Sequence, residues 1–129
     1  MKRCRTDSGI FQKKEKTMEK VQNFFVGNDI RGREVDPGVT RKVLAHNSDL
    51  MVCELHFRKG AVGNLHSHPH TQCTYIISGS FEFDIDGRKM VLGPGDSTYK
   101  QSGVVHGAVC LEEGTLLDIF TPQRDEFLK

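Results

Sequence analysis

The chain has 129 residues, of which 27% are charged, and its formal net charge is +1. That length is typical of one domain with its own core, and the near-neutral charge does not favour a nucleic-acid-binding surface. No apolar run is long enough to cross a membrane, so we expect neither a nucleic acid nor a membrane as partner.

The basic residues are concentrated at the start of the chain. Residues 1–17 hold six lysines and arginines against Asp7 and Glu15. The segment has no apolar stretch of the length that a secretory signal needs. We expect a disordered basic tail over 1–17 and a single domain over 18–129, with Met18 as an alternative start of the native chain.

The four cysteines carry no metal-binding or disulfide signature. Their positions include no CxxC pair: Cys4, Cys53, Cys73 and Cys110. Without an export signal, such cysteines are expected to be reduced thiols, which predicts a cytoplasmic protein.

Short apolar runs separated by glycine-rich turns follow one another along the chain. Polar residues and turn formers occupy 28–38, and the last residues, 123–129, suggest one helical turn. The Asp86-Gly87 pair between two alternating runs predicts a hairpin with a type I′ turn. No helical periodicity extends over three turns, so we expect an all-β sandwich or barrel with its core at about 39–121. The predicted strands are 21–26 (at a sheet edge), 39–46, 50–57, 73–78, 81–85, 90–92, 97–100, 106–110 and 115–121.

Three of the six histidines lie within five residues, at His66, His68 and His70. On an extended strand, residues i and i+2 point to the same face, which would place His66 beside His68. His106 lies in a similar setting downstream. The pattern predicts one divalent metal bound inside a β-barrel.

The spacing around these histidines resembles that of the cupin family. The first cupin motif matches Gly60-x5-His66-x-His68-x3-Gln72-x6-Gly79, and the second matches the stretch from Gly95 through Gly103 to His106. The resemblance implies a double-stranded β-helix, a small jelly-roll barrel. It also implies a metal held by four side chains: His66, His68, Gln72 and His106.

The sequence departs from the family pattern at three positions: Gln72 for the usual glutamate, Gln101 for a proline and Cys110 for an asparagine. Gln72 is the informative departure, because an amide cancels none of the charge of the metal. A divalent ion held only by neutral ligands favours an anionic substrate in a partly desolvated pocket. Imidazole and amide ligands suit Ni, Fe, Zn, Mn or Co, and the sequence does not choose among them.

Longer stretches resemble the pectin-degradation cupins of the KdgF type, at 66–70, 95–97, 106–107, 111–114 and 117–127. The resemblance implies ring opening of 4,5-unsaturated uronates, derived from pectin or alginate, to the linear 5-keto-4-deoxyuronate. It would make Asp118 the catalytic residue, with Arg124 and Phe120 as contacts of a small sugar-acid substrate. For cupins of this size we also expect a homodimer.

The residue pattern around Asp118 agrees with that role. Leu116, Asp118 and Phe120 share one face of their strand, and a carboxylate on an otherwise apolar inner face is costly without a purpose. The alternative is a buried carboxylate that anchors the strand end. For Arg124 the alternative is a surface ion pair with Asp125 or Glu126.

Two other functions fit the same motifs: a metal-dependent dioxygenase and a non-catalytic module that binds sugar acids. His70 is expected to serve outside the metal ligands, by touching substrate or capping a turn. We expect Tyr75 to pack inside the barrel, and His46 and His56 to be surface or hydrogen-bonded histidines.

Overall fold

The computed structural model describes residues 20–129, and the predicted tail over 1–17 and boundary at 18 lie outside this range. No helix in the described range is long and apolar enough to cross a membrane. Two short 3-10 helices flank the strands, η1 (Gly27–Asp29) and η2 (Asp125–Leu128). The strands are β1 (Arg33–Asp36), β2 (Val39–Asn47), β3 (Leu50–Phe57), β4 (Val62–His66), β5 (Thr71–Ile76), β6 (Ser80–Ile85), β7 (Arg88–Leu92), β8 (Ser97–Lys100), β9 (His106–Glu112) and β10 (Gly114–Thr121).

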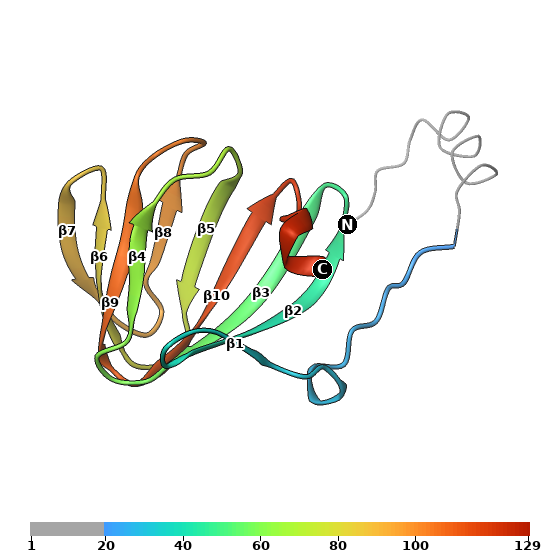
Figure 1. Ribbon diagram of the computed structural model, residues 1–129, viewed down its shortest axis with the longest axis horizontal. Coiled ribbons are helices and arrows are strands. Elements are labelled where there is room, and N and C mark those ends of the chain that lie inside the picture. The colour runs from blue at the N-terminus through green and yellow to red at the C-terminus, as the bar shows by residue number, and fades with distance from the viewer. Residues whose placement is uncertain (1–19) are drawn as a thin grey trace.

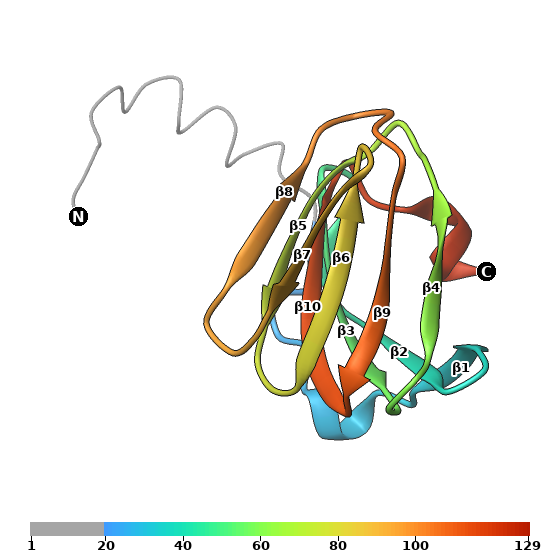
Figure 2. The same cartoon turned by 90° about the vertical axis from the view of Figure 1, so that its left-hand side faces the viewer.

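The strands pair antiparallel in two sheets that face each other (Figures 1 and 2). The larger sheet has the order β1-β2-β3-β10-β5-β8, and the smaller has the order β4-β9-β6-β7. The last strand in the chain, β10, therefore lies in the middle of the larger sheet, between β3 and β5. This is a jelly roll, and the predicted all-β double-stranded β-helix is confirmed.

The core fills the space between the sheets because apolar residues alternate along the strands. Its main cluster draws on both sheets: Val39, Phe57, Ala61, Ile76, Phe81, Phe83, Cys110 and Leu116. The rings of Phe57 and Phe81 meet edge-on across the sheets with their centroids 5.3 Å apart. A second cluster, of Met51, Cys53 and Phe120, lies towards one end of the barrel.

The predicted hairpin forms between β6 and β7. Asp86 and Gly87 both have positive φ, at 54° and 81°, as a type I′ turn requires. The other predicted strands from residue 39 onward also form, with ends shifted by a few residues.

Two expectations for the first part of the domain were wrong. Residues 21–26 form no strand: no strand pairs with them, and Val21, Phe24 and Val26 stay exposed, Phe24 at 85%. The stretch predicted as turns over 28–38 instead contains β1, which pairs with β2 through Arg33 and Arg41. Charged residues at both ends of β1 hid this strand, because they give it no apolar alternation.

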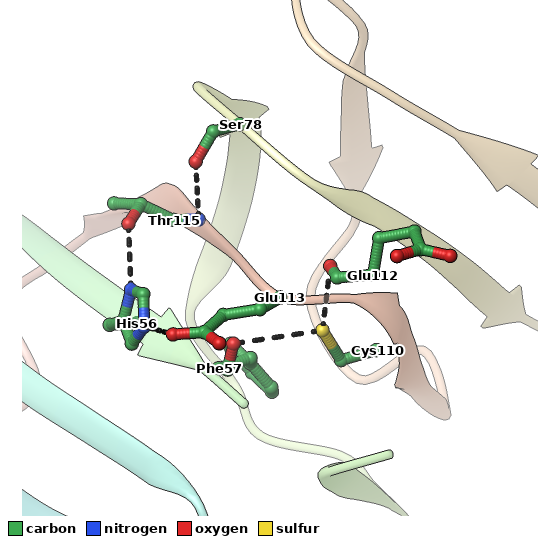
Figure 3. A network of polar contacts seen from close by, with 7 residues as sticks. All are labelled: His56, Phe57, Ser78, Cys110, Glu112, Glu113 and Thr115. Atoms are coloured by element: carbon green, nitrogen blue, oxygen red, sulfur yellow. Dashed lines mark hydrogen bonds and ion pairs between the residues drawn. The ribbon is translucent and has the colours of Figure 1, made fainter. Parts of the chain in front are cut away.

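A polar network fastens the turn between β9 and β10 to the end of β3 (Figure 3). The Nε2 atom of His56 lies 2.7 Å from Oε2 of Glu113, and its Nδ1 atom lies 3.0 Å from Oγ1 of Thr115. The Thr115 amide donates to Ser78 Oγ at 3.0 Å, and the Cys110 thiol donates to the Glu112 carbonyl at 3.1 Å. His56 is thus hydrogen-bonded as expected, at the end of the barrel away from the other histidines.

Candidate metal centre and active site

The predicted ligands come together at one end of the barrel because of the strand register. His66, the last residue of β4, pairs with His106, the first residue of β9. In the larger sheet, Gln72 of β5 lies between Phe120 of β10 and Lys100 of β8.

His68 reaches the same place from a loop. We expected it to share a strand face with His66, but β4 ends at His66 and the chain turns over 67–70 before β5 begins. Pro69 explains the break, because proline donates no hydrogen bond to a ladder and restricts the residue before it.

Gly107 allows β4 to approach β9 closely beside the histidines. A Cβ atom built on Gly107 would lie 2.7 Å from the Gly63 carbonyl oxygen and 3.1 Å from the Leu65 nitrogen. The β4–β9 ladder is irregular at this point, between Gly63 and His66. The missing side chain after His106 is therefore part of what places His66 against it.

Hydrogen bonds to the backbone occupy the Nδ1 atoms of the three histidines. Each Nδ1 lies near a backbone carbonyl: His66 at 2.8 Å from Asn64, His68 at 3.0 Å from His70, and His106 at 3.0 Å from Val104. A carbonyl only accepts, so each Nδ1 carries the hydrogen and each Nε2 keeps a bare lone pair. The nitrogens of this His66/His68/His106 cluster lie within 4.8 Å of one another, close enough to hold one metal ion.

His106 supports the fit of a metal ion most directly. Its side chain is buried at 3% exposure, and its Nε2 atom has no hydrogen-bond partner. Burial lowers the pKa of His106 to about 4, so the imidazole is neutral near pH 7 and able to ligate. A buried, unpartnered lone pair is costly without a cation to receive it.

Gln72 adds an oxygen to the same group. Its side chain is buried, and Oε1 lies 2.9 Å from the bare Nε2 of His68. Two lone pairs at this distance repel each other unless a cation lies between them. Two ligand bonds of about 2.1 Å at right angles put their ligand atoms roughly 3.0 Å apart, so the spacing fits two ligands of one ion.

A cavity of about 260 Å³ opens beside the cluster, lined by His66, Gln72 and His106 on one side. Asp118 lies on its wall, and Oδ1 accepts a 2.6 Å hydrogen bond from Thr74. Leu116 and Phe120 are buried on the same face of β10, so the predicted alternation is confirmed.

Arg124 and Phe120 line this cavity too. The Arg124 side chain is only 12% exposed, and its Nε donates to Glu126 Oε2 at 2.7 Å, so Arg124 makes the expected ion pair while it also lines the cavity. Its guanidinium carbon lies 5.1 Å from the centroid of the Phe120 ring and 4.4 Å from that of Phe127.

Arg41 is a cavity residue that the sequence did not reveal. It comes from β2, and its guanidinium carbon lies 3.5 Å from the centroid of Phe127. Burial lowers the pKa of Arg41 from its ordinary value, and the nearby Arg124 charge acts in the same direction. Two guanidinium groups thus share one aromatic ring beside Asp118, which makes this part of the wall suited to an anion.

Lys100 is a second cavity residue that the sequence analysis did not identify. Its side chain is 2% exposed inside the barrel, and Nζ donates to Thr74 at 2.7 Å and to Thr98 at 2.6 Å. Burial lowers the pKa of Lys100, an effect that the Asp118 carboxylate partly offsets. The alternation of β8, with Thr98 and Lys100 facing inward, was the available signal.

Three other side chains considered in the sequence analysis can be located in the structure. His70 lies outside the histidine cluster, with its buried Nδ1 unpartnered and its ring 6.4 Å from that of Phe120. His46 bonds to Gln123, as expected of a satisfied histidine. The expectation that Tyr75 packs inside was wrong: it is 45% exposed on the outer face, because Gln72, Thr74 and Ile76 take the inward positions of β5.

The chain belongs to the cupin family: the model of the cupin domain matches residues 53–120. Both cupin motifs lie within that match, so the resemblance drawn from the spacing of the histidines is confirmed.

Within the family, the chain is similar to KdgF proteins. It is 39% identical over 110 residues to the pectin degradation protein KdgF of Dickeya dadantii (strain 3937), covering 84% of this chain and 100% of that one. The structure of KdgF from Halomonas sp. matches with a TM-score of 0.80 and 38% identity, over 83% of this chain and 99% of the other. An RmlC-like cupin from Shewanella frigidimarina NCIMB 400 matches with a TM-score of 0.80 and 37% identity, over 85% and 99%. The protein is therefore a KdgF-like cupin.

Proposed function

We propose that this cupin opens the ring of 4,5-unsaturated uronates, giving the linear 5-keto-4-deoxyuronate. One observation carries the proposal: Asp118 lines the same cavity as two members of the histidine cluster, His66 and His106. Arg41 and Arg124 line that cavity too. The likeness to a pectin degradation protein over its whole length supports a substrate from pectin.

The charges of the cavity suit a sugar acid. Arg41, Arg124 and Lys100 line it, against the carboxylates of Asp36 and Asp118. The guanidinium groups on Phe127 would hold the uronate carboxylate, since the planar fork of arginine matches a carboxylate. Phe120 would support the apolar face of the sugar ring.

Asp118 would move the proton in the reaction. As water adds to C5, the Oδ2 atom of Asp118 accepts a proton from that water and passes it to C4. The C4=C5 double bond thereby becomes a single bond, and C5 becomes a hemiketal carbon. The bond between C5 and the ring oxygen then breaks as the C5 hydroxyl gives up its proton and the ring oxygen takes one up. C5 becomes a ketone, the ring oxygen stays on C1 as a hydrated aldehyde, and loss of water from C1 makes the net change an isomerisation.

A divalent metal would be held by His66, His68, His106 and Gln72, and Ni, Fe, Zn, Mn and Co are the metals that suit these ligands. Such an ion supplies Lewis-acid polarisation of bound oxygen atoms. Because all four ligands are neutral, its positive charge adds to the attraction for an anionic substrate. Metal analysis of the purified protein identifies the ion.

The direct test mixes metal-loaded protein with an unsaturated galacturonate and follows the ultraviolet absorbance of its C4=C5 double bond. We expect a faster loss of absorbance than in buffer, and NMR of the product should show the C5 ketone. No acceleration over buffer would reject the activity. Binding without turnover would favour a sugar-acid binding module, and oxygen uptake with a diketone or flavonol would favour a dioxygenase.

We further propose that the protein acts as a homodimer in the cytoplasm. The outer face of the larger sheet supports a dimer, because Tyr75 and Tyr99 are 45% and 62% exposed on neighbouring strands. Cys53, Cys73 and Cys110 are free thiols, in keeping with a reducing compartment. Light scattering tests the dimer; a monomer in the wild type, or a dimer that survives Tyr99→Lys, would contradict this interface.

A further inference from the structure

The hydroxyl group of Thr74 lies at the centre of three polar side chains inside the barrel. Thr74 is 1% exposed on β5. Its Oγ1 atom lies 2.7 Å from Lys100 Nζ, 2.6 Å from Asp118 Oδ1 and 3.3 Å from Gln72 Nε2. One oxygen thus contacts a proposed metal ligand, the proposed catalytic carboxylate and a buried lysine.

Each hydrogen in this network can be assigned by counting donors and acceptors. A carboxylate only accepts, so the single O–H proton of Thr74 is donated to Asp118. The hydroxyl oxygen then has two lone pairs left, and it accepts from Lys100 and from Gln72. Thr74 has no further capacity, and its orientation is fully determined.

This count fixes the orientation of the Gln72 amide. Because Thr74 has no second proton to donate, the side of the amide that faces it must be the NH₂ group. The carbonyl oxygen Oε1 must therefore face Nε2 of His68, 2.9 Å away. A reversed amide would present N–H groups, which have no lone pair for a cation, to the histidines.

Lys100 holds Thr74 in this arrangement. Within residues 20–129 it forms no ion pair with a carboxylate, and its hydrogen bonds go to the hydroxyls of Thr74 and Thr98. The Phe83 ring lies beneath the amine, with Nζ 5.3 Å from its centroid. Burying an amine costs free energy, and the hydrogen bonds of this one go to two hydroxyl groups. That arrangement points to a role in positioning.

We propose that Thr74 and Lys100 are positioning residues that couple the metal ligand Gln72 to Asp118. Lys100 donates to Thr74 and fixes its hydroxyl. That hydroxyl turns the Gln72 oxygen to the metal and holds the Asp118 carboxylate at the cavity wall. The part of this inference that concerns Asp118 rests on the proposed function, whereas the part that concerns Gln72 does not.

Metal affinity of the apoprotein tests the Gln72 part without any substrate. Competition between the protein and a chromophoric chelator for Co²⁺ or Zn²⁺ gives the affinity of each variant. Thr74→Val keeps the shape but removes the hydroxyl, and we expect about 10- to 100-fold weaker binding, as is typical when a partner of a metal ligand is lost. Thr74→Ser should restore binding. An affinity for Thr74→Val within twofold of the wild type would overturn the inference.

Lys100→Met tests the lysine, with exposed Lys59→Met as the matched control. We expect Lys100→Met to weaken metal binding and to change the visible spectrum of the Co²⁺ protein, while Lys59→Met matches the wild type. The melting temperature should hold or rise, since methionine replaces a buried amine. A lower melting temperature with wild-type metal affinity would mean a structural role only and would overturn the proposal.

Kinetics at saturating metal test the Asp118 part. Thr74→Val and Lys100→Met should lower kcat at least tenfold with little change in KM. A raised KM with unchanged kcat and metal affinity would instead make Lys100 a substrate contact, against the proposal. If the wild type opens no uronate, the proposed function fails, and the metal affinities still decide whether Thr74 and Lys100 orient Gln72.

Discussion

The Arg41 guanidinium stacks on the ring of Phe127, its carbon 3.5 Å from the ring centroid, and Arg124 lies 4.4 Å from that same centroid. The ring thus brings two like charges to one wall of the cavity. Glu126 pairs with Arg124, but Arg41 has no ion-pair partner within residues 20–129. A bound carboxylate would relieve the repulsion between the two cations.

Replacing Arg41 by leucine should therefore weaken substrate binding. We expect KM to rise about 10- to 100-fold with kcat changed little, because a hydrogen bond to a charged group contributes about 1.5–3 kcal/mol. Steady-state kinetics on an unsaturated uronate measure both constants. Arg88→Leu, in the exposed β6–β7 hairpin, is the control, and an unchanged KM for Arg41→Leu would remove Arg41 from the substrate site.

Asp118→Asn should abolish turnover while metal binding remains. The amide keeps nearly the same shape but cannot carry the proton between water and C4, and loss of such a group typically costs about 10²- to 10⁴-fold in rate. Absorbance assays and metal analysis on the same preparation check both halves. Asp49→Asn, in an exposed turn, should behave as the wild type. Wild-type turnover by Asp118→Asn would show that another group moves the proton.

The metal-free protein should lose stability as the pH falls from 6.5 towards 4. The folded pKa of His106 is about 4, below its ordinary value of 6.5, so in this window the unfolded chain binds a proton that folded His106 does not. The unfolding free energy then falls by at most about 1.4 kcal/mol per pH unit from this group, and above the window the group has no effect. Burial lowers the pKa of His68 as well, which acts in the same sense.

Urea unfolding in the presence of a chelator, repeated across this pH range, measures that slope. His106→Asn removes the titrating group. It should reduce the slope of unfolding free energy against pH by an amount that corresponds to at most one bound proton. Equal slopes for the two proteins would show that His106 protonates as readily in the folded chain as in the unfolded one.

Gly79 of the first cupin motif can be tested against Gly87 of the β6–β7 turn. Both have positive φ, at 86° and 81°, so alanine at either position incurs roughly 1–2 kcal/mol of backbone strain. A Cβ atom at Gly79 would also lie 2.6 Å from the Glu112 carbonyl oxygen, whereas Gly87 has nothing within 4 Å. Gly79→Ala should therefore lose about 1–3 kcal/mol more than Gly87→Ala in urea unfolding. Equal losses of unfolding free energy would mean that the backbone around Gly79 shifts to accommodate the methyl group at no cost.

The histidine cluster could be predicted from the spacing within two sequence motifs, and the inward face of β10 could be predicted from the alternation along one strand. Motif spacing selected His66, His68, Gln72 and His106, and a period of two placed Asp118 inside. The path of the chain was harder to predict: Pro69 moves His68 off the strand, a purely local effect that the alternation of the histidines concealed.

Arg41 and Lys100 could not be recognised in the same way. Long cationic side chains are mostly exposed, so a lysine at an inward position of β8 is easily taken for a surface residue. The role of Arg41 depends on β2 lying across from the end of β10, where η2 brings Phe127 beneath it. That closeness arises from tertiary closure and leaves no local pattern in the sequence.

The position of β10 in the sheet has a consequence for how the protein comes to be made. Every proposed metal ligand is synthesised before residue 114, but Asp118 arrives on the strand that fills the gap between β3 and β5. Until that strand inserts, two sheet edges stay unpaired and open to other chains. A chain that ended at residue 113 would thus leave two strand edges open to aggregation although it carried every proposed metal ligand, and the proposed acid–base residue joins the protein only with the strand that closes the sheet.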